Sequence, residues 1–133
     1  MMKKVMLLCA LAGVAALFAG CSTVQSVGVK DLSNQSLTPS GTTIAHITAS
    51  TGGFYFLWIP LLTGSEVNPG KIAVFEDSCH VTQTSRMVTR EAQKLGATRT
   101  INMVSSQNSS MFPAPIPFLF YWKTATVSGN AVR

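Results

Sequence analysis

The chain has 133 residues, a length that predicts one compact domain, and a formal net charge of +5. Charged residues make up only 11% of it and hydrophobic residues 47%, which excludes a charge-rich disordered tail. Its ten basic residues are scattered and form no basic stripe, so the composition excludes nucleic acid as a partner.

The first 20 residues have the pattern of a secretory signal. Lys3 and Lys4 form a short positive segment, and an uncharged apolar run follows from Val5 to Ala19. This run is shorter than the about 20 apolar residues that span a bilayer, and small residues follow it. We therefore predict a signal peptide over residues 1–20 rather than a transmembrane helix.

Cys21 directly follows the small residues Ala19 and Gly20. This junction resembles the lipobox of bacterial lipoproteins and matches its last three positions. The resemblance implies cleavage between Gly20 and Cys21, a diacylglycerol group on the Cys21 thiol and an acyl chain such as palmitate on the new amino terminus. Ser22 implies, by the same resemblance, an outer-membrane location facing the periplasm. An ordinary secretory signal with an incidental Cys21 is the alternative.

Removal of the signal changes the charge and the cysteine count. Loss of Lys3 and Lys4 lowers the net charge to +3, and no second run of membrane-spanning length remains. Cys9 would leave with the signal and Cys21 would carry lipid, so that Cys79 is the last free thiol. We therefore expect no disulfide framework, and a fold held by its hydrophobic core.

Residues 21–41 are rich in Ser, Thr, Gln and Asn and end in Pro-Ser-Gly, a composition typical of a tether. Val24, Val27, Val29 and Leu32 could still dock part of this segment onto the domain. We expect a lipidated tether at 21–41 and a small domain at 42–133.

The domain begins with a pattern of strands. Residues 42–48 are rich in β-branched side chains and predict a short strand. Residues 50–53 end in two glycines and predict a turn. The aromatic run 54–62 predicts a second strand, stopped or bent by Pro60.

A helix follows in the middle of the chain. Residues 63–70 are expected to form a loop, and residues 71–75 a short strand or the approach to the helix. Apolar residues at helical spacing predict a helix from Asp77 or Ser78, either of which can cap it, to Leu95. The glycine after Leu95 is a natural stop.

The chain ends in a strand, a long loop and a last strand. Residues 97–104 predict a strand, the Ser-, Asn- and Pro-rich residues 105–117 a loop, and residues 118–127 the final strand. We therefore predict an α+β fold, ββαββ-like, with a single sheet of four to five mainly antiparallel strands packed on one helix.

Two segments of the domain resemble a pattern in small bacterial envelope domains. The helix end and junction at 92–97 (AQKLGA) and the C-terminal residues 128–132 (SGNAV) look like those of the YbjQ-type family and of the outer-membrane sensor of the Rcs stress phosphorelay. The resemblance implies a small α+β fold. It carries over no functional residue, because the paired cysteines of the Rcs sensor are missing here.

Cys79 and His80 are the candidates for nucleophilic or redox chemistry. A helix N-terminus lowers the pKa of a thiol, and Cys79 is therefore a possible reactive thiol. A catalytic nucleophile also needs an oriented base and an oxyanion site. The alternative is a buried inert thiol beside a surface imidazole. We therefore expect no catalytic residue. A thiol-based envelope stress sensor that uses Cys79 is the alternative hypothesis.

The candidate metal ligands do not form a recognisable site. They are His46, Glu76, Asp77, Cys79 and His80. A structural zinc site needs about four Cys or His ligands at tight spacing, and the two carboxylates are equally suited to helix capping. We expect no metal and no cofactor, although a small-ligand or metal carrier using the 105–117 loop stays an alternative.

Two aromatic runs share the pattern Phe-x-Phe-x-Trp. At strand period each run places three aromatic rings on one face of a sheet and apolar residues on the other. One helix covers one face only, so these rings predict an interface with a protein partner or a second copy, or central core strands, or contact with a bilayer surface. The possible interface residues are Phe54, Phe56, Trp58, Phe118, Phe120 and Trp122.

The expected protein is thus a non-catalytic outer-membrane lipoprotein. It would contact the membrane through its lipid anchor and bind a protein partner or assemble as a homo-oligomer through the aromatic runs.

Overall fold

The computed structural model describes residues 22–32, 41–111 and 119–133. The expected signal peptide, its cleavage junction at Gly20 and Cys21, and Phe118 lie outside the described residues. Six strands and one helix are described: β1 Ser22–Gly28, β2 Thr43–Phe56, β3 Ile59–Gly64, β4 Ile72–Val74, α2 Val81–Lys94, β5 Arg99–Met111 and β6 Phe120–Val132.

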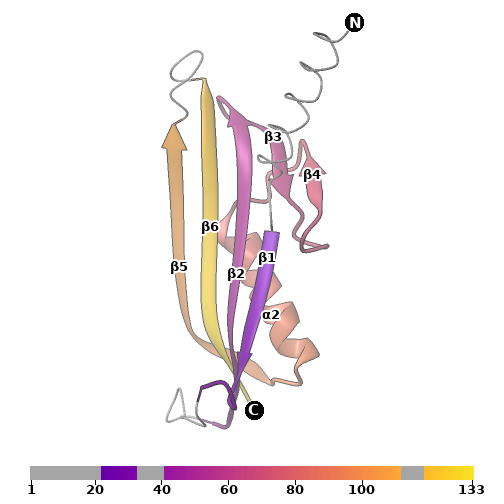
Figure 1. The fold of residues 1–133 in the computed structure, drawn as a ribbon, viewed down its shortest axis with the longest axis vertical. Helices are drawn as coiled ribbons and strands as arrows, with labels where there is room; N and C mark the ends of the chain where they lie inside the picture. Colours follow the sequence, from indigo (N-terminus) through magenta and orange to yellow (C-terminus); the bar gives the residue numbers. More distant parts are fainter. Residues whose placement is uncertain (1–21, 33–40, 112–118) are drawn as a thin grey trace, which may run out of the picture.

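The strands form one antiparallel sheet in the order β4-β3-β2-β6-β5, and β1 pairs with the first half of β2. Helix α2 packs across one face of this sheet, against β2, β6, β5 and β1 (Figure 1). The α+β class, the antiparallel sheet and the helix agree with the expectation from sequence, but the sheet has six strands rather than four or five.

The prediction of a turn at residues 50–53 is wrong, because these residues lie inside β2, an unbroken strand of 14 residues. A Cβ on Gly52 would lie 2.9 Å from Cζ2 of Trp122, and one on Gly53 would lie 2.7 Å from Sγ of Cys79. Real Cβ atoms do not approach neighbours so closely, so the two glycines provide packing space within a strand.

The single strand expected at 54–62 is instead a hairpin. Strand β2 ends at Phe56, Leu57 has a left-handed φ of 54°, and β3 starts at Ile59. Trp58 therefore lies in the turn, and it does not continue the face of Phe54 and Phe56 as expected.

Part of the expected tether belongs to the sheet. Ser22–Gly28 pairs residue for residue with β2, and Val24 packs against the core. Residues 22–28, expected to lie in the tether, therefore form part of the sheet. Val24, one of the residues expected to dock this segment, does so because its position in β1 faces the side of the sheet that α2 covers.

Helix α2 starts at Val81, later than expected, with His80 as N-cap and no side-chain cap. Asp77 and Ser78, the expected caps, instead hydrogen-bond to sheet residues: Asp77 to Tyr55, and Ser78 to the hydroxyl of Thr63. The helix buries Met87, Val88 and Ala92 against apolar residues of β2 and β6, namely Ala45, Ile47, Ala49, Val127 and Ala131.

The loop expected at 105–117 is a strand at least as far as Met111. Residues 104–111 pair one by one with β6, and backbone pairing overrides the low strand preference of their Ser and Asn side chains. The last strand also runs longer than expected, to Val132, and Gly129 lets Thr100 approach it.

Candidate functional site

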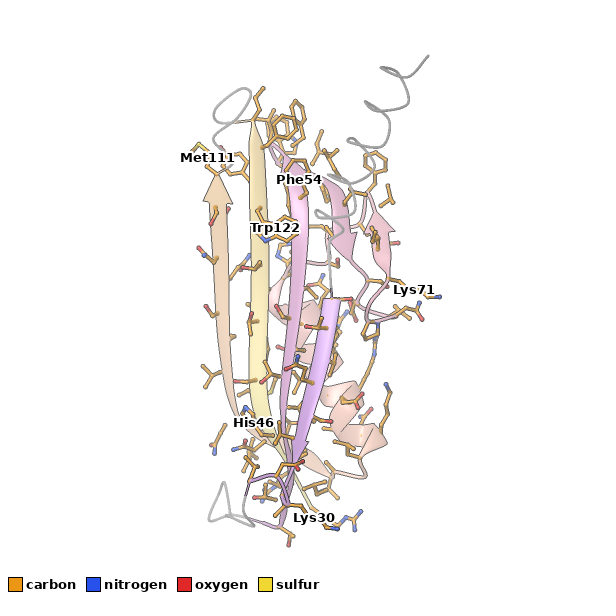
Figure 2. The ribbon with its side chains drawn as sticks, in the orientation of Figure 1. Lys30, His46, Phe54, Lys71, Met111 and Trp122 are labelled. Carbon is orange, nitrogen blue, oxygen red and sulfur yellow. The ribbon has the colours of Figure 1, made fainter. Side chains whose placement is uncertain are left out.

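The sheet has one covered face and one open face. In β2 the odd-numbered residues from 45 to 51 are buried on the side of α2, and the even-numbered residues between them point away from it. We call the side opposite α2 the open face, since no described helix or strand covers it. Figure 2 shows side chains along the whole length of this sheet.

The half of the open face near the C-terminus is polar. Paired positions on β2 and β6 there carry His46 with Asn130 and Ser50 with Thr126. Nδ1 of His46 lies 2.7 Å from Oδ1 of Asn130, and the two hydroxyls of Ser50 and Thr126 lie 3.3 Å apart. These side chains therefore satisfy much of one another's hydrogen-bonding capacity.

The other half of the open face is aromatic. Phe54, Phe56, Phe120 and Trp122 are half-buried here, and we call these four residues the aromatic cluster. The rings of Phe54 and Phe120 stack with centroids 5.3 Å apart and planes 8° apart, and Phe56 lies 5.3 Å from Phe120 at 54°. Such offset and tilted ring pairs are favourable beyond their buried area.

Two aliphatic residues extend the aromatic cluster into an apolar row across four strands. Val74 of β4 pairs with Leu62 of β3, Leu62 pairs with Phe54 of β2, and Phe54 pairs with Trp122 of β6. Phe54 and Trp122 lie toward the same end of the sheet, far from His46 (Figure 2). Sequence reasoning missed Leu62 and Val74, because only the strand register places them beside the cluster.

Four of the six possible interface residues are thus brought together. Trp58 is separate from them in the β2–β3 turn and is 76% exposed, and Phe118 lies outside the described residues.

A second cluster joins the segment before α2 to the covered face. The hydroxyl of Tyr55 donates to Oδ1 of Asp77, whose Oδ2 lies 2.9 Å from Nε2 of His80. Nζ of Lys123 lies 4.1 Å from the centre of the Tyr55 ring. Burial would raise the pKa of Asp77, but the hydrogen bonds with Tyr55 and His80 outweigh it and lower that pKa. Burial raises the pKa of Tyr55.

Cys79 does not have the properties of a reactive thiol. Its side chain is fully buried, and burial raises its pKa to about 11, so that it is protonated at neutral pH. Its neighbour His80 pairs with Asp77 instead. The helix N-terminus was expected to lower this pKa, but the cost of burying the charged thiolate dominates.

The candidate metal ligands are dispersed. His46 lies on the open face beside Asn130, whereas Asp77 and His80 pair with each other before α2. Within residues 22–32, 41–111 and 119–133, no three His, Cys, Asp or Glu side chains group closely enough to hold a metal ion.

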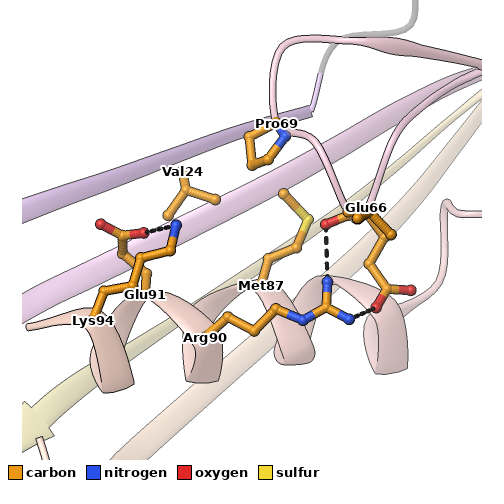
Figure 3. Close-up of a pocket in the computed structure, with 8 residues that line it drawn as sticks. Val24, Glu66, Pro69, Met87, Arg90, Glu91 and Lys94 are labelled. Carbon is orange, nitrogen blue, oxygen red and sulfur yellow. Dashed lines mark hydrogen bonds and ion pairs between the residues drawn. The ribbon is translucent and has the colours of Figure 1, made fainter.

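A small hollow lies between α2, β1 and the β3–β4 loop (Figure 3). Nη2 of Arg90 on α2 lies 3.0 Å from Oε1 of Glu66 in the β3–β4 loop and so joins two of its walls. Nζ of Lys94 and Oε2 of Glu91, 3.1 Å apart, form an ion pair along α2. The hollow has a volume of about 30 Å³, and another at the C-terminal end of α2 has about 70 Å³. These volumes suit a few water molecules rather than a substrate, and neither is lined by residues 105–111.

No family model, curated protein or solved structure matches this chain. Within the described part of the chain, no helix has both the length and the apolar character needed to cross a membrane.

Proposed function

We propose that this protein is a lipid-anchored component of the bacterial outer membrane that works by binding protein, either a partner or a second copy of itself, and not by catalysis. The observation that carries the proposal is the aromatic cluster on the open face. Half-buried aromatic rings on β2 and β6, extended by Leu62 of β3 and Val74 of β4, offer apolar contact area of the kind that protein interfaces use.

The proposal of a lipid anchor rests on the lipobox-like junction at Cys21. The position of β1 indicates where this anchor would join the domain. Because β1 begins at Ser22, a lipid on Cys21 would be attached to the residue next to the sheet, with no spacer. Such an anchor would hold the whole domain close to the membrane surface.

Strand β5 favours a second copy over a foreign partner. It is an edge strand of 13 residues, and the part from 100 to 111 carries no charged residue and no proline. Soluble proteins usually protect such an edge with charge or proline, because it can pair with another strand.

The first experiment tests the anchor. The full chain and its Cys21→Ser variant are expressed in a Gram-negative host with labelled palmitate. We expect label and outer-membrane fractionation for the full chain, and loss of both for the variant. A full chain without label would remove the lipid anchor from the proposal.

The second experiment tests the interface by crosslinking in intact cells. Phe56→Lys places a charge in the aromatic cluster, and Thr48→Lys places the same charge on the polar half of the same strand and face. We expect Phe56→Lys to abolish the crosslinked complex and Thr48→Lys to retain it, with thermal unfolding showing that both variants fold. A strictly monomeric protein, or equal complexes from both variants, would contradict the proposed interface.

The alternative of a thiol-based sensor or of a small-ligand or metal carrier has no observation in its favour. Cys79 is buried and protonated, and residues 105–111 of the expected loop form a strand.

A further inference from the structure

A group of exposed apolar side chains lies on and next to the β3–β4 pair, and one of them, Val74, borders the aromatic cluster through Leu62. Trp58 is 76% exposed and Phe75 is 70% exposed, and three aliphatic side chains beside them are also exposed. Phe75 follows β4, and its backbone nitrogen donates to the carbonyl of Leu61, 3.4 Å away. We call this group the apolar tip; its members are Trp58, Ile59, Ile72, Val74 and Phe75.

The backbone is strained at two points of this region. Leu57, which precedes Trp58, has a φ of 54°, and Phe75 has a φ of 59°. Large side chains rarely adopt this left-handed conformation, because their Cβ atom comes too close to the backbone carbonyl. Burial of the ring does not compensate for the strain at Phe75, because the ring is exposed. Strain of this kind is typical of functional positions.

The apolar tip lies close to the site proposed for the lipid. Ser22 is fully buried, its hydroxyl donates to the carbonyl of Ser65 at 2.7 Å, and its own carbonyl accepts from the Gly70 nitrogen at 2.7 Å. Residue 21 is therefore the neighbour of a residue fixed against the β3–β4 loop. From Gly70 to Phe75 the chain spans at most about 17 Å, at about 3.3 Å per residue.

The orientation of the strands agrees with this placement. Strand β1 starts beside β3 and β4 and runs from there toward the end of the molecule that carries the C-terminus (Figure 1). A lipid on residue 21 would thus leave the domain at the end of β1 that lies beside the β3–β4 loop, whereas the other end of β1, at Gly28, pairs with Ala45 next to His46.

We propose that the apolar tip is a second membrane contact, and that it enters the headgroup region of the lipid surface that holds the anchor. Tryptophan and phenylalanine favour this region. Lys71 is exposed beside Ile72 and suits anionic headgroups, while Glu76 is exposed beside Phe75 and keeps the contact shallow. The contact fixes how the domain stands on the membrane. The inference rests on the lipid anchor proposed above.

The chain has two tryptophans, which makes the contact measurable. Trp122→Phe leaves Trp58 as the sole tryptophan, and Trp58→Phe leaves Trp122 as the matched control. Each purified full chain is reconstituted into phosphatidylcholine–phosphatidylglycerol vesicles, with and without brominated acyl chains. We expect Trp58 emission to shift to the blue and to lose most of its intensity with brominated lipid, and Trp122 emission to change little.

A second pair of variants separates the apolar tip from exposed apolar residues in general. In the Trp122→Phe background, Phe75→Ser should reduce the quenching of Trp58. Val67→Ser, at an apolar side chain as exposed as Phe75 but outside the apolar tip, should leave it unchanged.

The outcomes distinguish the two proposals. A protein that floats with the vesicles while Trp58 emission stays water-like overturns the membrane contact and leaves the anchor in place. Equal quenching of both tryptophans places the open face on the lipid and also overturns the assignment to the apolar tip. A protein that does not float, and carries no palmitate label, overturns the anchor and the contact together.

Discussion

Gly53 is the position where one methyl group should cost the most stability. A Cβ there would lie 2.7 Å from Sγ of Cys79 and 2.7 Å from Cγ2 of Thr63, and 3.1 Å from Cε2 of Tyr55. Favourable contacts between carbon atoms lie at about 3.5–4.0 Å, so all three distances are repulsive. The three neighbouring side chains are fully buried and cannot move into solvent.

We therefore expect Gly53→Ala to lower the free energy of unfolding by about 1–3 kcal/mol, the usual cost of overpacking a core. In a domain of about 100 residues, each kcal/mol lost from the free energy of unfolding lowers the melting temperature by about 4–8 °C. Thermal and denaturant unfolding of the purified full chain in detergent measure both quantities.

The matched control is Gly28→Ala, where the nearest atom to a Cβ is Oδ2 of Asp31 at 3.9 Å and little change is expected. Cys79→Ala removes one of the three close atoms, so the double variant with Gly53→Ala should recover at least about 0.5 kcal/mol relative to additivity. Full stability of Gly53→Ala, or strict additivity in the double variant, would refute the close packing around Gly53.

Three further predictions follow from the covered face and the apolar tip. Asp77→Asn should lower stability at neutral pH by about 1 kcal/mol by weakening its hydrogen bonds with Tyr55 and His80. Because the folded-state pKa of Asp77 is lowered, its contribution is complete above the ordinary pKa of about 3.9 and is lost as the pH falls through the lowered value. Acid titrations of stability for the two proteins should therefore converge, and a constant difference down to low pH would contradict this. The Cys79 thiol, with its pKa of about 11, should resist a thiol reagent at pH 8 until the protein is unfolded, and rapid labelling of the native protein would argue against its burial. Phe75→Gly should leave the free energy of unfolding unchanged within about 1 kcal/mol, since relief of strain offsets the flexibility of glycine, and a larger loss would mean that the ring stabilises the fold.

Much of the candidate surface could be anticipated from local pattern. The alternation in the two Phe-x-Phe-x-Trp runs placed Phe54 with Phe56, and Phe120 with Trp122, and the structure joins these pairs in the aromatic cluster. Trp58 was misplaced, because the hairpin at Leu57 interrupts the alternation. Cys79 is buried, as in the favoured interpretation of the sequence, and its raised pKa follows from that burial, which the local position at a helix N-terminus does not reveal.

The sequence alone determined the α+β class, the central helix and the strand character of the aromatic runs, because these depend on residue periodicity over short stretches. The tertiary structure decided what the Gly52–Gly53 pair does. In isolation two glycines favour a turn, but Trp122 and Cys79, both distant in sequence, fill the space beside them and keep β2 straight. It also decided which apolar residues stay exposed, since the strand register and the position of one helix set which face of the sheet is covered.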